Sequence, residues 1–169
     1  MPGVIEEFRE RLEEIKGWRH HLHAHPETAY QEHATADFVA AKLAEFGLTV
    51  HRGLAGTGVV GVLSTGDGPA IGLRADMDAL HIEECTNLPY ASCHAGRMHA
   101  CGHDGHTTML LAAASHLGRT RAFQGTAVFI FQPAEEHEGG GQAMVRDGLF
   151  EKFPMQAVYG MHNWPGAPA

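Results

Sequence analysis

The segment from residue 98 to residue 106 concentrates side chains that bind transition metals. It places Cys101 and His103 two residues apart, with a glycine between them that allows both to approach one small site. A thiolate and an imidazole together favour zinc or another late first-row ion. A helix-capping loop with solvated histidines would explain an isolated Cys-x-His pair. The additional histidines His99 and His106 favour a metal site instead.

Two adjacent acids, Glu135 and Glu136, follow an apolar segment that ends near Gln132. Neighbouring side chains in an extended segment point in different directions, so one carboxylate can bind a metal while the other faces the water that the metal activates. A ligand and a general base in this arrangement suit hydrolysis by metal-bound hydroxide. Two acids after a strand are otherwise typical of a solvated turn, so this interpretation depends on the nearby metal site.

Three further candidates lie where predicted strands end. His162 is a candidate ligand, although a single histidine at the end of a strand is more often structural. Asp76 and Asp78 could bind a metal or orient one of its ligands through a hydrogen bond. The histidines between residues 20 and 25 end the first predicted helix. Favourable contacts with the helix dipole explain them without a further role.

Helices that alternate with apolar strands are predicted to position these residues. Helical spacing of apolar residues predicts helices at residues 2–23, 32–46, 105–117 and 141–147. Strands are predicted at residues 48–52, 58–64, 70–76, 125–132 and 157–161. The continuous apolar run in the fourth strand is typical of a strand buried on both faces. This alternation predicts an α/β layered sheet, whose ligand site lies at the carboxyl ends of the strands.

Composition limits the class of protein. The chain has 169 residues, 44% of them hydrophobic and 19% charged, and no linker-like segment, so residues 1–169 are expected to form part of one domain. A net charge of −8 without a basic stripe argues against a nucleic-acid partner. No apolar run approaches the roughly 20 residues that cross a bilayer, and the N-terminus lacks a signal core, so no membrane partner and a cytoplasmic location are expected.

The three cysteines and fourteen histidines leave other chemistries open. An odd number of cysteines argues against a disulfide framework, although a bridge between Cys85 and Cys93 is compatible with the sequence. Cys101 could instead be the nucleophile of a cysteine hydrolase, with His103 or His106 as its base. That mechanism does not require the carboxylate pair. A structural zinc site would normally have four closed ligands and would leave no such pair.

Four ordered motifs resemble those of the hippurate hydrolases and N-acyl-amino-acid amidohydrolases. These are two-metal peptidases related to the aminoacylases, and they include plant auxin-conjugate hydrolases. The motifs are Arg-Ala-Asp-Met-Asp-Ala-Leu (74–80), Met-His-Ala-Cys-Gly-His-Asp-Gly-His (98–106), Gln-Pro-Ala-Glu-Glu (132–136) and Gly-Met-His-Asn (160–163). The earlier string Arg-His-His-Leu-His-Ala-His-Pro-Glu (19–27) fits as well. The resemblance therefore covers essentially the whole chain.

The resemblance implies a role for each candidate. The implied metal ligands are Cys101, His103, Glu136 and His162. Glu135 is implied to be the general base, and Asp78 to support a ligand through a hydrogen bond. More distant relatives have a metal-binding histidine at the position of Asp76. His103 is therefore expected to supply that ligand here, which leaves Asp76 a supporting role at most. His81 stands where the family usually has proline.

The resemblance also implies cofactors, substrate and assembly. Two divalent ions (Mn, Zn, Co or Ni) share a bridging water, and an N-acyl amino acid is split into a carboxylic acid and an amino acid. Family members are more than twice as long and carry a satellite domain, through which the intact enzyme is expected to form a homodimer or a higher oligomer. This chain is expected to be the N-terminal portion of a zinc-peptidase-like catalytic domain, a layered mixed sheet flanked by helices, truncated before that satellite domain. The isolated chain is then either an impaired enzyme or an inactive, metal-binding fragment.

Overall fold

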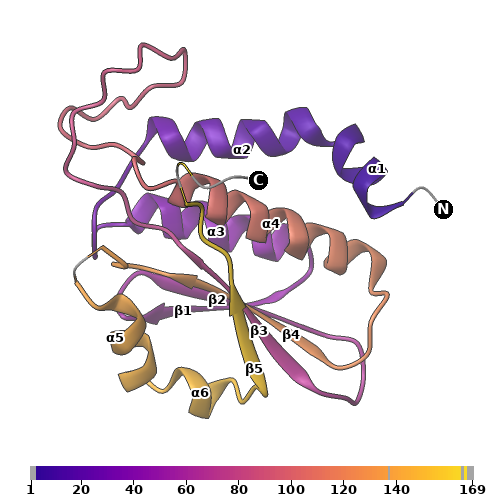
Figure 1. Cartoon of the computed structure of the whole chain (residues 1–169). Coiled ribbons are helices and arrows are strands. Elements are labelled where there is room, and N and C mark those ends of the chain that lie inside the picture. Colours follow the sequence, from indigo (N-terminus) through magenta and orange to yellow (C-terminus); the bar gives the residue numbers. More distant parts are fainter. Residues whose placement is uncertain (1–2, 137, 165, 167–169) are drawn as a thin grey trace.

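The computed structural model describes residues 3–136, 138–164 and 166, which form a five-stranded sheet with helices on both faces (Figure 1). The strands are β1 (Thr49–Leu54), β2 (Gly58–Ser64), β3 (Ala70–Asp76), β4 (Thr126–Gln132) and β5 (Ala157–Gly160). Their order in the sheet is β1-β2-β4-β3-β5. β2 pairs antiparallel with β1 and β4, whereas β3 pairs parallel with β4 and β5. The predicted α/β class with a mixed sheet is confirmed.

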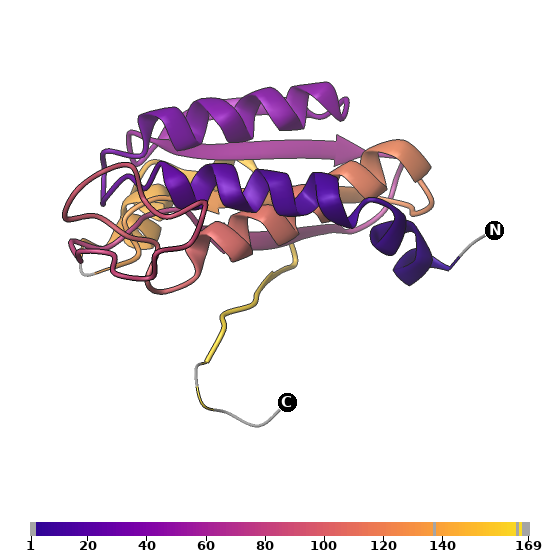
Figure 2. The ribbon, with the colours of Figure 1, turned by 90° about the horizontal axis from the view of Figure 1, so that it is seen from above.

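The helices form two unequal layers around this sheet. They are α1 (Val4–Glu10), α2 (Leu12–Ala24), α3 (His33–Glu45), α4 (His103–Thr120), α5 (Gly140–Arg146) and α6 (Leu149–Lys152). Helices α2, α3 and α4 lie on one side of the sheet, and α5 and α6 lie on the other (Figure 1). Figure 2 shows that residues 161–164, which follow β5, project beyond the edge of the sheet.

Strand β4 forms the centre of both hydrophobic cores because its side chains alternate between the two faces. Phe129 and Phe131 are completely buried in the core with α2, α3 and α4. Val128 and Ile130 are buried in the smaller core that includes Met144 of α5. The prediction that this strand is buried on both faces is confirmed, and β4 is therefore a rigid base for the acidic residues that follow it.

Two local predictions were wrong. The helix predicted over residues 2–23 is interrupted at Arg11, which separates α1 from α2. Long-range contacts explain the break: Arg11 Nη1 donates to Ser115 Oγ over 2.9 Å, and His116 Nδ1 lies 2.7 Å from the carboxylate of Glu7. Helix α4 begins at His103, two residues earlier than predicted, so a candidate ligand lies inside its first turn.

The long connection between β3 and α4 carries all three cysteines, including the two that could have formed a bridge. Cys85 and Cys93 are both free and exposed, so no bridge between them is present. Among the described residues, no helix combines the length and apolar character needed to cross a membrane.

Candidate metal centre

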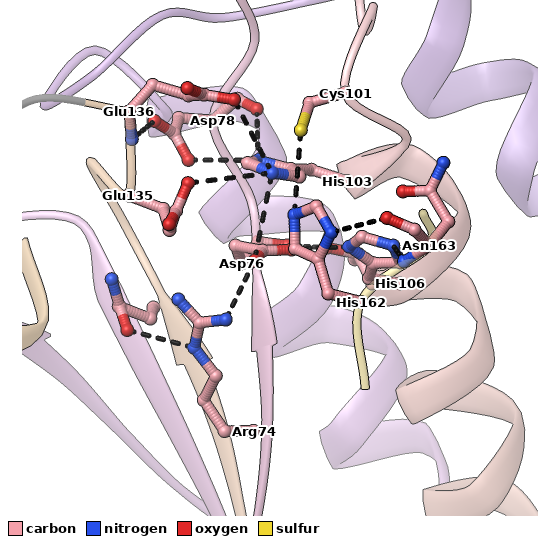
Figure 3. A network of polar contacts seen from close by, with 12 residues as sticks. Arg74, Asp76, Asp78, Cys101, His103, His106, Glu135, Glu136, His162 and Asn163 are labelled. Atoms are coloured by element: carbon pink, nitrogen blue, oxygen red, sulfur yellow. Dashed lines mark hydrogen bonds and ion pairs between the residues drawn. The ribbon is translucent and has the colours of Figure 1, made fainter. Parts of the chain in front are cut away.

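The candidate site lies where β3 and β4 end and α4 begins (Figure 3). Gly102 precedes α4 with a φ of 95°, in the left-handed region that favours glycine. A Cβ at this position would lie 3.0 Å from Asn163 Oδ1. The glycine between Cys101 and His103 therefore allows both the reversal of the backbone and the close approach of the segment after β5.

His103 is completely buried, and its two ring nitrogens have different surroundings. Nδ1 lies 2.8 Å from the carbonyl oxygen of Asp78 and 3.1 Å from its Oδ1. Both partners are acceptors, so Nδ1 carries the hydrogen and donates it. The lone pair is then on Nε2, which has no hydrogen-bond partner among the described residues. That tautomer is the one required of a histidine that binds metal through Nε2.

Three carboxylates surround this unpartnered nitrogen. His103 Nε2 lies 3.7 Å from Asp76 Oδ2, 3.8 Å from Glu136 Oε1 and 3.9 Å from Glu135 Oε2. Burial lowers the pKa of His103, but the hydrogen bond that it donates to Asp78 and the surrounding negative charges raise it overall. The carboxylate oxygens and the lone pair of His103 Nε2 are all acceptors. Bringing them together in a buried site is unfavourable unless a proton or a cation lies between them. The residues present therefore fit a cation.

The four predicted ligands are close together in space. Ligand atoms of Cys101, His103 and Glu136 all lie within 4.8 Å of one another. Cys101 Sγ is 3.5 Å from Nε2 of His162, which comes from the segment after β5. Burial, reinforced by the carboxylates of Glu136 and its neighbours, raises the pKa of the Cys101 thiol to about 12. The thiol is therefore protonated at neutral pH when no cation is bound.

Asp78 connects a predicted ligand with the acidic loop. Its Oδ1 accepts from His103, and its Oδ2 accepts from the backbone N–H of Glu136 over 2.9 Å. Burial raises the pKa of Asp78, but these hydrogen bonds lower it overall. Because both of its oxygens are engaged away from His103 Nε2, the geometry supports the predicted role of Asp78 as a support for a ligand.

Asp76 is held by hydrogen bonds from Arg74 and His106. Its Oδ2 accepts from Arg74 Nη1 over 2.7 Å, and its Oδ1 lies 2.7 Å from His106 Nδ1. Burial raises the pKa of Asp76, but the hydrogen bond from His106 and the charges of His103 and Arg74 lower it to about 2. Asp76 is thus ionised and contributes negative charge beside the predicted ligands.

His106 is a supporting residue, although the sequence predicted it as part of a metal-binding segment or, alternatively, as the base of a cysteine hydrolase. Although it lies within the His-Asp cluster around Asp76, its Nδ1 faces that carboxylate and its Nε2 accepts the backbone N–H of Asn163 over 3.1 Å. Both nitrogens are used, so His106 is a poor ligand. It instead fixes the segment that carries His162. Its position three residues after His103, on the same helical face, was the available signal.

This α/β fold brings thiol, imidazole and carboxylate groups together at the ends of its strands, an arrangement that suits a metal site in a layered-sheet protein. The chain belongs to the Peptidase family M20/M25/M40, whose model matches residues 72–169. The family of metal-dependent amidohydrolases expected from the motifs is thereby confirmed.

Individual relatives agree with this assignment. The chain is 52% identical over 164 residues to the hippurate hydrolase of Campylobacter jejuni subsp. jejuni, covering 96% of this chain and 43% of the relative. It is 44% identical over 154 residues to the N-acetyl-L-cysteine deacetylase of Bacillus subtilis, covering 90% and 36%. The crystal structure of Bacillus subtilis YXEP, described as a dinuclear metal binding peptidase of the M20 family, matches with a TM-score of 0.88 and 40% identity, over 95% of this chain and 45% of YXEP. The chain thus spans less than half the length of these relatives.

Proposed function

We propose that this chain provides most of a two-metal site that hydrolyses the amide bond of N-acyl amino acids. The observation that carries the proposal is the buried, unpartnered Nε2 of His103, which faces three carboxylates. The names of the hippurate hydrolase and the N-acetyl-L-cysteine deacetylase support N-acyl amino acids as the substrate class. The dinuclear centre named for YXEP supports two ions.

In this proposal each residue has a separate task. The residues that would hold the metal are Cys101, His103, Glu136 and His162. Divalent ions, once bound, polarise the amide carbonyl and lower the pKa of water. Glu135, whose side chain is 37% exposed, accepts a proton from the attacking water and returns it to the amide nitrogen as the carbon–nitrogen bond breaks. Asp78 keeps His103 in the tautomer that presents Nε2.

The proposed function is tested by assaying hippurate and N-acetyl amino acids with chelator-treated protein, before and after addition of Mn²⁺, Zn²⁺, Co²⁺ or Ni²⁺. Hydrolysis is expected only after metal is restored. Chelator-resistant hydrolysis that is lost on thiol alkylation would support the cysteine hydrolase instead. Metal uptake without hydrolysis of any substrate would contradict the proposed activity for this chain and would support the metal-binding fragment.

A cavity beside Glu136 suits the acyl group of such a substrate. Its volume is about 310 Å³, and its apolar walls include Ala29, Leu80 and Ile82. Glu136 and Glu138 also line it, so it disfavours the carboxylate of the substrate. We therefore infer that the uncharged acyl half occupies this cavity and that the amino-acid half lies outside it. His81, which replaces the usual proline of the family, also lines the cavity.

Replacing Ile82 by aspartate is expected to raise KM for hippurate about tenfold, because a buried apolar contact with the benzoyl ring is replaced by a charge. N-acetyl substrates should be affected much less, since the acetyl group is small. Ile82 is 44% exposed, so the fold should tolerate the change. Val145→Asp is the control, because Val145 is equally exposed on α5 and does not line the cavity. Equal KM changes for both substrates would exclude this placement of the acyl group.

A further inference from the structure

Glu32 is a completely buried carboxylate outside the set of predicted ligands. It lies directly before α3, and its Oε1 accepts the backbone N–H of Ala134 over 2.8 Å. Its Oε2 accepts from Thr57 Oγ1, in the turn between β1 and β2, over 2.7 Å. One side chain thus connects the start of a helix, a hairpin turn and the loop that follows β4.

This arrangement is an unfavourable way to fill a core. Burial raises the pKa of Glu32, and the charge of Asp78 raises it further, while the hydrogen bonds from Thr57 and Ala134 lower it only in part. A buried carboxylate is costly unless hydrogen bonds compensate for the water that it has lost. The carboxylate is therefore better explained by what it holds in place.

The group that it holds is the residue immediately before the acidic pair. Ala134 has a φ of 51°, in the left-handed region that a residue other than glycine rarely adopts. Its N–H donates to Glu32, and its carbonyl oxygen accepts from the N–H of Gly140 over 2.9 Å. These two contacts fix both sides of the strained residue, which turns the chain sharply at the end of β4.

Two buried carboxylates therefore hold alternate N–H groups of the same loop. Glu32 holds residue 134, and Asp78 holds the N–H of Glu136 over 2.9 Å. Glu135 lies between these two anchors, with Oε2 3.9 Å from His103 Nε2. The direction of its side chain is set by the backbone on either side, so a change at Ala134 is transmitted directly to Glu135.

We propose that Glu32 is a positioning residue, which holds Ala134 in its left-handed conformation and thereby directs Glu135 toward the candidate metal centre. The part of this inference that concerns catalysis rests on the proposed function. The part that concerns the backbone does not. Glu32 touches none of the reacting atoms and acts only through the loop.

Three variants separate the hydrogen bond to Ala134 from burial and charge. Glu32→Met keeps a side chain of similar length but has no acceptor. Glu32→Gln keeps one carbonyl oxygen for the N–H of Ala134. Thr57→Val, the matched control, removes the other partner of the same carboxylate and leaves the contact with Ala134 in place.

Amide hydrogen exchange of the metal-free protein tests the backbone directly. Exchange at Ala134 is expected to accelerate about tenfold or more in Glu32→Met, because its buried donor loses its acceptor, and to change little in Glu32→Gln and Thr57→Val. In the metal-loaded protein, Glu32→Met should lower kcat about tenfold at unchanged KM and metal content, and Glu32→Gln should restore most of it.

The outcomes distinguish this proposal from a merely structural role and from the proposed function. Unchanged exchange at Ala134 in Glu32→Met would overturn the proposal, as would equal effects of Glu32→Met and Thr57→Val. If Glu32→Met does not fold, Glu32→Asp takes its place, because its side chain is one methylene shorter and its oxygens are withdrawn from the N–H of Ala134. Unchanged exchange at Ala134 in that variant would be equally contradictory. The expected exchange pattern in a protein that hydrolyses no substrate would leave the positioning intact and contradict only the proposed function.

Discussion

Changing Glu135 to glutamine is expected to lower turnover of an N-acyl amino acid by about a thousandfold while leaving the bound metal in place, because a positioned general base contributes roughly 10²–10⁴-fold. Glutamine has the shape of glutamate but cannot accept a proton from water. Glu135 is the more exposed of the acidic pair, at 37% against 19% for Glu136, so its carboxylate faces the side from which substrate and water arrive.

Glu136→Gln is the matched comparison, since it makes the same chemical change one residue along the chain. It removes a predicted ligand whose Oε1 lies 3.8 Å from His103 Nε2, so both metal content and turnover should fall. Elemental analysis and the initial rate, measured on the same preparations, separate the two effects. If Glu135→Gln kept more than about a few per cent of the parental rate, Glu135 would not be the general base.

The strands could be predicted from local sequence patterns, most clearly where a strand is a continuous apolar run. The apolar run of β4 requires burial on both faces wherever the strand is placed in the sheet. The break at Arg11 could not be predicted in this way, because it depends on contacts with Ser115 and His116, more than 100 residues away. The strand order likewise depends on long-range pairing, which helical or strand periodicity does not contain.

In the candidate site, too, the residues that form local motifs could be predicted, and those that depend on contacts distant in the sequence could not. Cys101 and His103 are two residues apart, and the acids are adjacent, so their chemistry was visible as motifs. Asp78 was predicted as a support for a ligand, but the supporting contacts of His106 and Glu32 were not, because each acts on a distant backbone group. His106 acts on Asn163, and Glu32 acts on Ala134, 102 residues along the chain. A glutamate in the position of Glu32 has no local signature that distinguishes this role from that of a solvated residue.

Zinc is expected to raise the midpoint of thermal unfolding of the metal-free chain by roughly 8–16 °C at a free concentration about a thousand times Kd. A ligand at that concentration stabilises the folded state by about 4 kcal/mol. One kcal/mol corresponds to roughly 2–4 °C for a domain of this size. The physical source is the negative charge of Asp76, Glu135 and Glu136 around His103 Nε2, which a divalent ion neutralises.

A cysteine outside the site, Cys93, provides the control for this shift in the unfolding midpoint. Cys101→Ala removes a predicted ligand and should abolish most of the stabilisation, whereas Cys93→Ala, at an exposed free thiol, should preserve it. At a fixed concentration of free zinc, the shift should also increase with pH. The pKa of the Cys101 thiol is raised to about 12 without metal, so zinc must displace its proton, and that competition weakens as pH rises. Calorimetric scans at two pH values, with and without zinc, measure both effects. Equal shifts in the two cysteine variants would show that zinc stabilises the chain from somewhere other than this site.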